Sequence, residues 1–392
     1  MGGSSLIDNA DIIMGQSPPG ETCNATGQGI PLLNGPTEYG SHHPVPVQFT
    51  TDARKKARSG DILFCVRGST TGRMNWADRE YAIGRGVAAI RHKKNPALQP
   101  FVRAVIEYGL PGLLAQATGS TFPNVSADQL SDLWWPPIKE EEQRAIAHIL
   151  GTLDDKIELN RRMNETLEAM ARALFKSWFV DFDPVRAKAE GRDTGLPKAI
   201  ADLFPDSFVD SELGEIPKGW GVDSVYTVAE VIYGAPFASA KFNTDRIGKP
   251  LIRIRDLVDE SPEVFTSEEH PKGYLVKPGD IVVGMDGEFR AHLWGGIESW
   301  LNQRVCVFNP KPGFSSPFVF YSIIELLAEV EATETATTVI HIGKNDIDRF
   351  KIIVPARTIV TAFDRISKPL FHRIIVNKQE TRTLATLRDA LL

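Results

Sequence analysis

The sequence contains little cysteine and no hydrophobic run long enough to cross a membrane. Its three cysteines are isolated along 392 residues and form no CxxC pair, which argues against a disulfide framework and against a zinc site. A membrane-spanning helix needs about 20 consecutive apolar residues, and no such run occurs. No signal peptide opens the chain, and residues 1–5 (MGGSS) have the character of a start-site remnant or a frayed end. We therefore expect a cytoplasmic protein.

Positive charge is not in excess either. The 44 Lys and Arg residues are outnumbered by 50 Asp and Glu residues, for a net charge of −6. This net negative charge does not indicate nucleic-acid binding, although contact with phosphates needs only a local basic patch. Catalytic motifs are also missing: there is no GxxxxGK[ST] phosphate loop, GxGxxG turn, HExxH zinc helix or GxSxG nucleophile elbow. These absences argue against an enzyme without excluding one.

What the sequence does contain is an internal repeat at a spacing of 219 residues. Ala10–Gly15 (ADIIMG) recurs as Ala229–Gly234 (AEVIYG), and Gly60–Gly68 (GDILFCVRG) recurs as Gly279–Gly287 (GDIVVGMDG). Shorter matches at the same spacing join Ala117 and Thr118 to Ala336 and Thr337, and Pro136 to Pro355. Such self-similarity indicates a duplicated structural unit.

Each copy reads as a mixed α/β module followed by a long helix. Short apolar runs bounded by Gly and Pro, such as residues 62–66 and 281–285, predict β-strands. One helix per module is expected, over residues 100–109 and 316–332. The fold class is therefore α+β, with two duplicated mixed α/β modules. The expected division is a first module at 1–142, a long helix at 143–180, a linker at 181–213, a second module at 214–356 and a second long helix at 357–392.

Both long helices carry a heptad repeat, the signature of a coiled coil. Gln143–Trp178 corresponds to a rod of roughly 50 Å. The seam residues are Leu153, Ile157, Asn160, Leu167 and Leu174 in the first helix and Leu370, Ile374, Asn377, Leu384 and Leu391 in the second. A shift of 217 residues superimposes the two sets, Asn on Asn. We expect the Asn layers to set the register at a cost in stability. Two amphipathic helices packed on separate cores are the alternative.

Polar side chains suited to nucleic acid gather in the turns between the expected strands. Arg and Lys reach phosphates and guanine edges, while Asn and Gln match adenine. The residues expected to bind DNA are Arg54, Lys55, Lys56, Arg67, Thr70, Arg73 and Arg85 in the first module and Arg253, Arg255, Arg290, Asn302, Gln303 and Arg304 in the second. The common spacing places Arg85 opposite Arg304, and Arg73 opposite His292. For any single residue, a solvated surface charge is the competing interpretation.

The repeat, the segment GDILFCVRGSTTG, the run from PPIKEEEQR to FVDFDPVRAK and the start LGEIPKGW resemble the DNA-specificity subunit of type I restriction–modification systems. The resemblance covers nearly the whole chain. It implies that each module is a target-recognition domain and that the two helices form an antiparallel coiled coil that spaces them. Each module would then read one half of a split target in double-stranded DNA. The first copy departs from the pattern because nothing in it matches Gly214–Trp220.

The resemblance further implies a subunit without catalysis of its own. It would recruit two methylation subunits that bind S-adenosylmethionine and two restriction subunits that use ATP and Mg, to form an adenine methyltransferase and endonuclease. No cofactor, metal or membrane contact is expected for this chain itself. From the residues alone, a direct repeat with a helix after each module suits a target with two half-sites. An enzyme in its own right and a structural coiled-coil adaptor are the alternatives.

Overall fold

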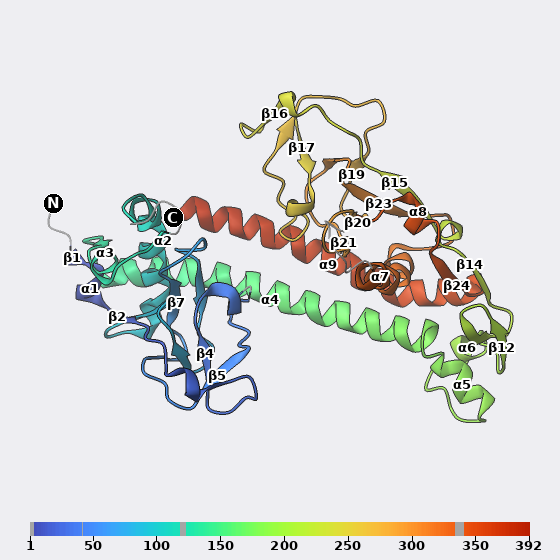
Figure 1. Ribbon diagram of the computed structural model, residues 1–392, viewed down its shortest axis with the longest axis horizontal. Helices are drawn as coiled ribbons and strands as arrows, with labels where there is room; N and C mark the ends of the chain where they lie inside the picture. Colours follow the sequence, from blue (N-terminus) through green and yellow to red (C-terminus); the bar gives the residue numbers. More distant parts are fainter. Residues whose placement is uncertain (1–3, 41, 118–122, 334–340) are drawn as a thin grey trace. The chain divides into compact units, whose positions relative to one another are not determined.

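The computed structural model describes residues 4–40, 42–117, 123–333 and 341–392. They divide into two compact units (Figure 1). Unit 1 comprises Met1–Glu158 and Thr383–Leu392, and unit 2 comprises Leu159–Arg382. Each unit contains one copy of the repeated module together with part of each long helix.

Unit 1 is built on two sheets. The strands of the first, in antiparallel order, are β2 (Ala10–Met14), β10 (Val87–His92), β7 (Ile62–Cys65) and β8 (Met74–Trp76). The strands of the second, in which β4 and β9 are parallel, are β3 (Cys23–Asn24), β5 (Gln48–Thr50), β4 (Ile30–Leu33), β9 (Tyr81–Ile83) and β6 (Lys56–Ala57). The remaining elements of this module are the pair β1 (Ser4–Ser5) and β11 (Trp134–Trp135) and the helices α1 (Leu6–Asn9), α2 (Gln99–Ala115) and α3 (Ala127–Ser131).

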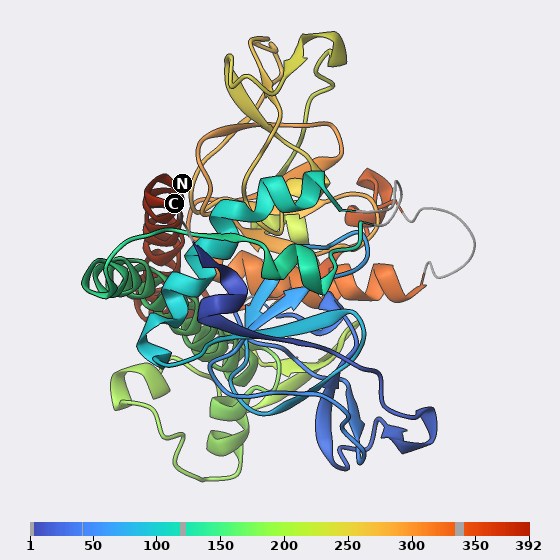
Figure 2. The same cartoon turned by 90° about the vertical axis from the view of Figure 1, so that its left-hand side faces the viewer.

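The core of unit 1 explains why β7 reads as a continuous apolar run. Ile62 and Phe64 join one hydrophobic cluster with Phe101 of α2, which lies across the sheet in Figure 2. Leu63 and Cys65 join a second cluster that includes the strands of the other sheet. Because successive side chains of a strand point to opposite faces, a strand covered on both faces shows no polar alternation.

Unit 2 repeats this strand order. Its sheets are β15 (Ala229–Tyr233), β23 (Val305–Pro310), β20 (Ile281–Gly284) and β21 (Ala291–Leu293), and then β16 (Phe242–Asn243), β18 (Phe265–Thr266), β17 (Lys249–Ile252), β22 (Ser299–Leu301) and β19 (Leu275–Val276). Its other module elements are the pair β14 (Gly221–Ser224) and β24 (Lys351–Val354) and the helices α7 (Ser316–Thr333) and α8 (Lys344–Ile347). The matching orders confirm the duplication and the α+β fold class.

The spacing between the copies is not constant, which corrects part of the sequence alignment. The pairing of β1 with β11 places Ser4 opposite Trp135, and that of β14 with β24 places Asp223 opposite Ile352. The spacing is therefore 219 at the first strand of each pair and 217 at the second, so Pro136 and Pro355 are not structural equivalents. The match of Thr118 with Thr337 lies outside the described residues.

The linker between α4 and the second module is structured. It forms the short helices α5 (Asp183–Ala189) and α6 (Lys198–Ala201), followed by a hairpin of β12 (Phe208–Ser211) and β13 (Gly214–Pro217). This hairpin contains the start of the GEIPKGW segment. The described part of unit 1 has no equivalent hairpin, in agreement with the sequence.

The long helices are α4 (Glu140–Phe179) and α9 (Arg357–Leu391). In unit 2, Asn160 Nδ2 donates to Glu380 Oε2 (2.9 Å), and Asn377 Nδ2 donates to Asn164 Oδ1 (2.8 Å). Residue numbers rise along α4 as they fall along α9, so the helices are antiparallel there. The shift of 217 therefore relates equivalent residues of the two repeats, such as Asn160 and Asn377. It does not give the residues that contact each other across the two helices.

The predicted seam residues differ in how far they are buried. Of the ten predicted seam residues, Asn160, Asn377 and Ile374 are fully buried, six are partly buried, and Leu391 at the end of α9 remains 55% exposed. Asn160 and Asn377 occupy neighbouring layers, each with its own polar partners on the opposite helix.

Candidate nucleic-acid interface

In unit 1, three turns meet beyond the end of β7. The backbone N–H of Val66 donates to the carbonyl oxygen of Gly86 (3.0 Å), and the carbonyl oxygen of Val66 accepts from the N–H of Val125 (2.9 Å). These bonds bring Arg67 and Arg85 to one place, and both side chains are exposed. We call residues 66–67, 84–86 and 124–125 the turn junction of unit 1.

Glycine is required in this junction because another backbone segment passes close to it. A Cβ at Gly84 would lie 2.5 Å from Asn34 Oδ1, and one at Gly86 would lie 2.3 Å from the carbonyl oxygen of Asn34. The N–H of Gly84 also donates to the carbonyl oxygen of Leu33 (2.8 Å). The turn that carries Arg85 is therefore held rigidly, as suits a side chain that must reach a defined position on a ligand.

Unit 2 forms the same junction with different side chains, and we apply the same name to residues 285–286, 302–304 and 341–342. The N–H of Met285 donates to the carbonyl oxygen of Arg304 (2.9 Å), and the N–H of Ile342 donates to that of Met285 (2.9 Å). Asp286 Oδ1 lies 2.6 Å from His341 Nδ1 and 3.4 Å from Arg304 Nη1. An Asp carboxylate accepts where the Arg67 side chain, at the equivalent position, can only donate.

The junctions also correct two of the expected equivalences. The carbonyl oxygens of Gly86 and Arg304 accept the equivalent backbone hydrogen bond, from the N–H of Val66 and of Met285. Arg304 therefore corresponds to Gly86 between the copies, and Gln303 corresponds to Arg85. The registers of β7 with β8 and of β20 with β21 likewise place Arg73 opposite Arg290, and not opposite His292. The spacing between the copies falls from 219 at β7 and β20 to 217 at Arg73 and 218 at Gly86, because the first copy has two or one more residues after β7 than the second has after β20.

The other predicted residues of unit 1 are spread around the junction. Arg54 forms an ion pair with Asp52 (2.9 Å), and Lys56 forms one with Glu80 (3.1 Å). The Lys55 carbonyl oxygen accepts from the N–H of Ile83 (3.0 Å), which places this basic run beside the end of β9 that leads to the junction.

Two predicted residues lie in the loop that follows Arg67. Arg73 donates to the carbonyl oxygen of Tyr39 (3.1 Å) and lies 6.0 Å from the Tyr39 ring. Its guanidinium therefore ties two loops of the module together. Thr70 is exposed in the same loop.

In unit 2, the predicted residues differ in how far they are engaged within the module. Arg253 forms two hydrogen bonds of 3.1 Å with the buried carboxylate of Asp256, and this pair holds a turn. Arg290 is exposed and pairs with Glu288 (2.9 Å). Asn302 Oδ1 accepts from the N–H of Gln303 (2.7 Å). The side chains of Gln303, Arg304 and Arg255 are exposed.

Sequence reasoning missed several polar side chains at the junctions. In unit 1, Asn34 Nδ2 donates to Gln48 Oε1 (3.0 Å), and Asn124 forms a backbone bridge with Arg67. In unit 2 the missed residues are Asp286 and His341. Asn34 and Asp286 each precede a glycine in the sequence, but only long-range backbone contacts bring these side chains to the junctions.

The thiols near these sites are poorly suited to chemistry. Burial raises the pKa of Cys65, and burial raises the pKa of Cys306 to about 12, so both stay protonated at neutral pH. Across the described ranges, no three His, Cys, Asp or Glu side chains come together as a metal site. No helix of those ranges is both long and apolar enough to span a membrane.

Two copies of one α/β module, each with a polar turn junction, and two long helices that are antiparallel in unit 2 define a modular protein with a duplicated polar surface. Residues 4–169 and 217–375 match the family model described as the type I restriction modification DNA specificity domain. The chain belongs to this family.

Relatives of known class agree with that assignment. The chain is similar to the type I restriction enzyme HindI specificity subunit of Haemophilus influenzae, with 26% identity over 87% of this chain and 86% of the relative. It is 30% identical to the MjaIX specificity subunit of Methanocaldococcus jannaschii, over 70% of this chain and 62% of the relative. The structure of a type I restriction–modification S subunit from M. genitalium shares the fold, with a TM-score of 0.59 at 15% identity, over 100% of this chain and 94% of that one.

Proposed function

We propose that the chain is the DNA-reading subunit of a type I restriction–modification complex and that each module reads one half of a split target. The observation that carries this proposal is the turn junction. The same backbone framework occurs in both modules, but it presents Arg67 and Arg85 in unit 1 and Asp286, Gln303 and Arg304 in unit 2.

The side chains at the two junctions would read different bases. Arg donates two hydrogen bonds to the O6 and N7 edge of guanine, Gln pairs with the N6 and N7 edge of adenine, and Asp accepts from the N4 amine of cytosine. A shared framework with different donors and acceptors therefore suits two half-sites of different sequence. The antiparallel helices would set the number of unread base pairs between them.

The chain itself would be non-catalytic. It would recruit two methylation subunits, which bind S-adenosylmethionine, and two restriction subunits, which use ATP and Mg, all in the cytoplasm. Membership of the specificity family supports this division of labour. If the chain were only a structural adaptor, the complex with the methylation and restriction subunits would still form, but its target sequence would not depend on this chain.

The experiment is to express the chain with the methylation subunit of its own system and to map methylated adenines across a genome by single-molecule sequencing. We expect one bipartite motif with an unread gap, and no methylation when either protein is expressed alone. A single continuous motif, or methylation by the chain alone, would contradict the proposal.

To assign the half-sites, the same mapping is repeated with Arg85→Ala and with Gln303→Ala. Each variant should relax one half of the motif and leave the other half unchanged. Relaxation of both halves by either variant would show that the modules do not read separately.

A further inference from the structure

Glu260 of unit 2 combines a strained backbone with a buried charge. Its backbone is left-handed (φ 52°) although it is not glycine, and the residue is only 7% exposed. Both features cost free energy, because the left-handed conformation crowds a Cβ atom and a buried carboxylate gives up its hydration. A residue of this kind persists only where its surroundings hold it in place.

Two cations of α9 hold Glu260. Lys378 Nζ lies 2.6 Å from Glu260 Oε1, and Arg382 Nη2 donates to the carbonyl oxygen of Glu260 (2.9 Å). Both cations also bond to a second loop of the module, since Lys378 donates to the carbonyl oxygen of Leu293 (2.8 Å) and Arg382 to that of Gly295 (3.1 Å). The N–H of Gly295 donates to Glu260 Oε2 (2.9 Å). We call Glu260, Gly295, Lys378 and Arg382 the α9 clamp.

The second loop approaches the clamp so closely that it requires glycine. A Cβ at Gly295 would lie 2.6 Å from Lys378 Cδ, and one at Gly296 would lie 2.9 Å from the carbonyl oxygen of Glu260. The carboxylate of Glu260 accepts hydrogen bonds at both of its oxygens. Its buried charge is therefore matched, which is the condition under which such a charge is tolerated.

The loops held by the clamp carry candidate reading residues of unit 2. The first loop runs from Arg253 to Glu260 and includes the exposed Arg255. The second loop, which contains Gly295, leads through β22 to the turn junction at residues 302–304. Helix α9 is therefore tied to both segments of the second module that carry these residues.

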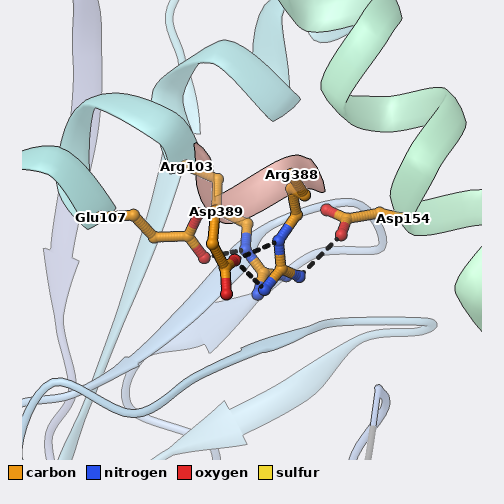
Figure 3. Close-up of polar contacts among 5 residues, drawn as sticks. All are labelled: Arg103, Glu107, Asp154, Arg388 and Asp389. Atoms are coloured by element: carbon orange, nitrogen blue, oxygen red, sulfur yellow. Dashed lines mark hydrogen bonds and ion pairs between the residues drawn. The ribbon is translucent and has the colours of Figure 1, made fainter. Parts of the chain in front are cut away.

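The ion pairs of unit 1 that Figure 3 shows have a different arrangement. Arg388 of α9 lies 3.0 Å from Asp154 of α4 and 2.7 Å from Asp389, so it joins the two long helices. Arg103 pairs with Glu107 (2.8 Å) within α2 of the module. Neither arrangement joins the module to a long helix, as the clamp does in unit 2.

The repeat does not place a second clamp on α4. At the spacing of 217 residues, Lys378 corresponds to Arg161 and Arg382 corresponds to Glu165. Arg161 and Glu165 pair with each other along α4, so a carboxylate replaces the second cation of the clamp. Duplication of the module therefore does not account for the clamp.

We infer that Glu260, Lys378 and Arg382 are positioning residues for DNA reading, because they hold the second module in one orientation on α9. Its turn junction would then meet a half-site at one fixed distance along the helices. This role in reading rests on the proposed function. One base pair occupies about 3.4 Å of DNA, so a module that could move on α9 by this amount would accept more than one gap.

The test variant combines Glu260→Gln with Lys378→Met, which removes the charge pair and nearly keeps the size of both side chains. Replacement of both members of a buried ion pair by neutral groups costs little stability, whereas loss of one member leaves a buried charge. The matched control, Lys249→Met with Glu298→Gln, makes the same changes at an ion pair within the second module (2.8 Å).

A second variant covers the case in which the test variant does not fold. Arg382→Met removes the hydrogen bonds of Arg382 to the carbonyl oxygens of Glu260 and Gly295 and leaves the buried charge pair in place. It is measured in the same two assays, and the same changes are expected.

Distances between two spin labels measure the position of the module on α9 in the full chain. The labels are attached at Glu230→Cys on β15 and Ile366→Cys on α9, two exposed positions of unit 2, with Cys23→Ser in every protein. We expect the test variant to widen the distance distribution by about 3 Å, close to the rise of one base pair. The control should keep the parent width.

Mapping of methylated adenines, with the methylation subunit of the same system, measures the gap. The test variant should keep both half-sites but methylate sites whose gap is about one base pair shorter or longer, in addition to the parent gap. The control should keep a single gap. A merely structural role of the clamp would lower stability without this change in the motif.

An unchanged distance distribution in the test variant would overturn the inference, and so would a wider distribution with a single unchanged gap. If the parent chain itself gives no bipartite motif, the proposed function fails. The spin-label distances do not depend on methylation, so they still decide whether the clamp holds the second module on α9.

Discussion

At the scale of single residues, the two junctions differ in charge although they share a backbone. Arg67 and Arg85 make the junction of unit 1 cationic, whereas Asp286 in unit 2 neutralises part of the charge of Arg304. Phosphate attraction falls with salt according to the number of cations that contact the backbone. We therefore expect binding through unit 1 to depend more steeply on salt than binding through unit 2.

Arg85→Ala and Arg304→Ala should each weaken binding of the assembled complex to its target by about 1–3 kcal/mol, the cost of a lost base contact. The measurement is equilibrium binding to labelled duplexes at several salt concentrations. Arg79→Ala serves as the control, because Arg79 is exposed but already paired with Asp78. Unchanged affinity and salt slope in both variants would remove these two residues from the interface.

His292, on β21, makes unit 2 sensitive to acid. Burial lowers the pKa of His292 to about 4, and the charges of Lys378 and Arg290 add to this effect. Between the ordinary value of 6.5 and about 4, the unfolded chain binds a proton that the folded chain excludes, so stability falls as the pH falls through this window.

His292→Gln should flatten this dependence. The free energy of unfolding of unit 2 in urea, measured at pH 7 and pH 5, should fall less in the variant than in the parent chain. His372→Gln, at an exposed position of α9, is the control and should keep the parent slope. Equal slopes for all three proteins would show that His292 does not titrate in this range.

At the scale of elements, the coiled coil contains polar layers that cost stability. Asn377 donates to Asn164, yet its own buried Oδ1 has no hydrogen-bond partner among the described residues. A buried polar atom without a partner is destabilising, and an Asn layer is retained where it defines the alignment of helices.

Replacement of both residues of this layer, Asn164→Leu with Asn377→Leu, should raise the thermal midpoint of unit 2 and loosen the helix register. Asn377→Leu alone should be less favourable, because it leaves the Asn164 amide facing an apolar group. Differential scanning calorimetry measures the midpoints, and cysteine cross-linking across the helices measures the register. A double variant of lower stability with an unchanged register would contradict this account.

At the scale of the whole molecule, both long helices pass from one compact unit into the other. The units divide α4 between Glu158 and Leu159, and α9 between Arg382 and Thr383. These two points lie in the same layer of the antiparallel pair, as the contacts of Asn160 with Glu380 and Thr381 show. A change made there in both helices would leave the contacts within each unit intact.

Insertion of one heptad at both points, with Leu at the seam positions, should lengthen the helices by about 10 Å. The methylated motif should keep both half-sites and gain about three base pairs of gap, at 3.4 Å per base pair. Genome-wide mapping of methylated adenines measures the gap. As a control, four inserted residues should break the seam and reduce assembly. An unchanged gap after the heptad insertion would show that the helices do not set the spacing.

The sequence by itself determined what depends on local pattern. The heptads predicted α4 and α9, the short apolar runs predicted strands such as β7 and β20, and the repeat predicted two modules of one fold. Their physical basis is periodicity, which places side chains on one face without reference to distant residues. The family was evident for the same reason, since its characteristic segments are contiguous in the chain.

Tertiary structure alone decided how distant segments meet. The shift of 217 superimposes Asn160 on Asn377, but the antiparallel pairing separates them into neighbouring layers, because a repeat correspondence carries no information on direction. A constant spacing aligned Arg85 with Arg304, whereas backbone hydrogen bonds align Arg85 with Gln303. Asp286 and His341 are 55 residues apart, and only the fold of the module brings them into contact.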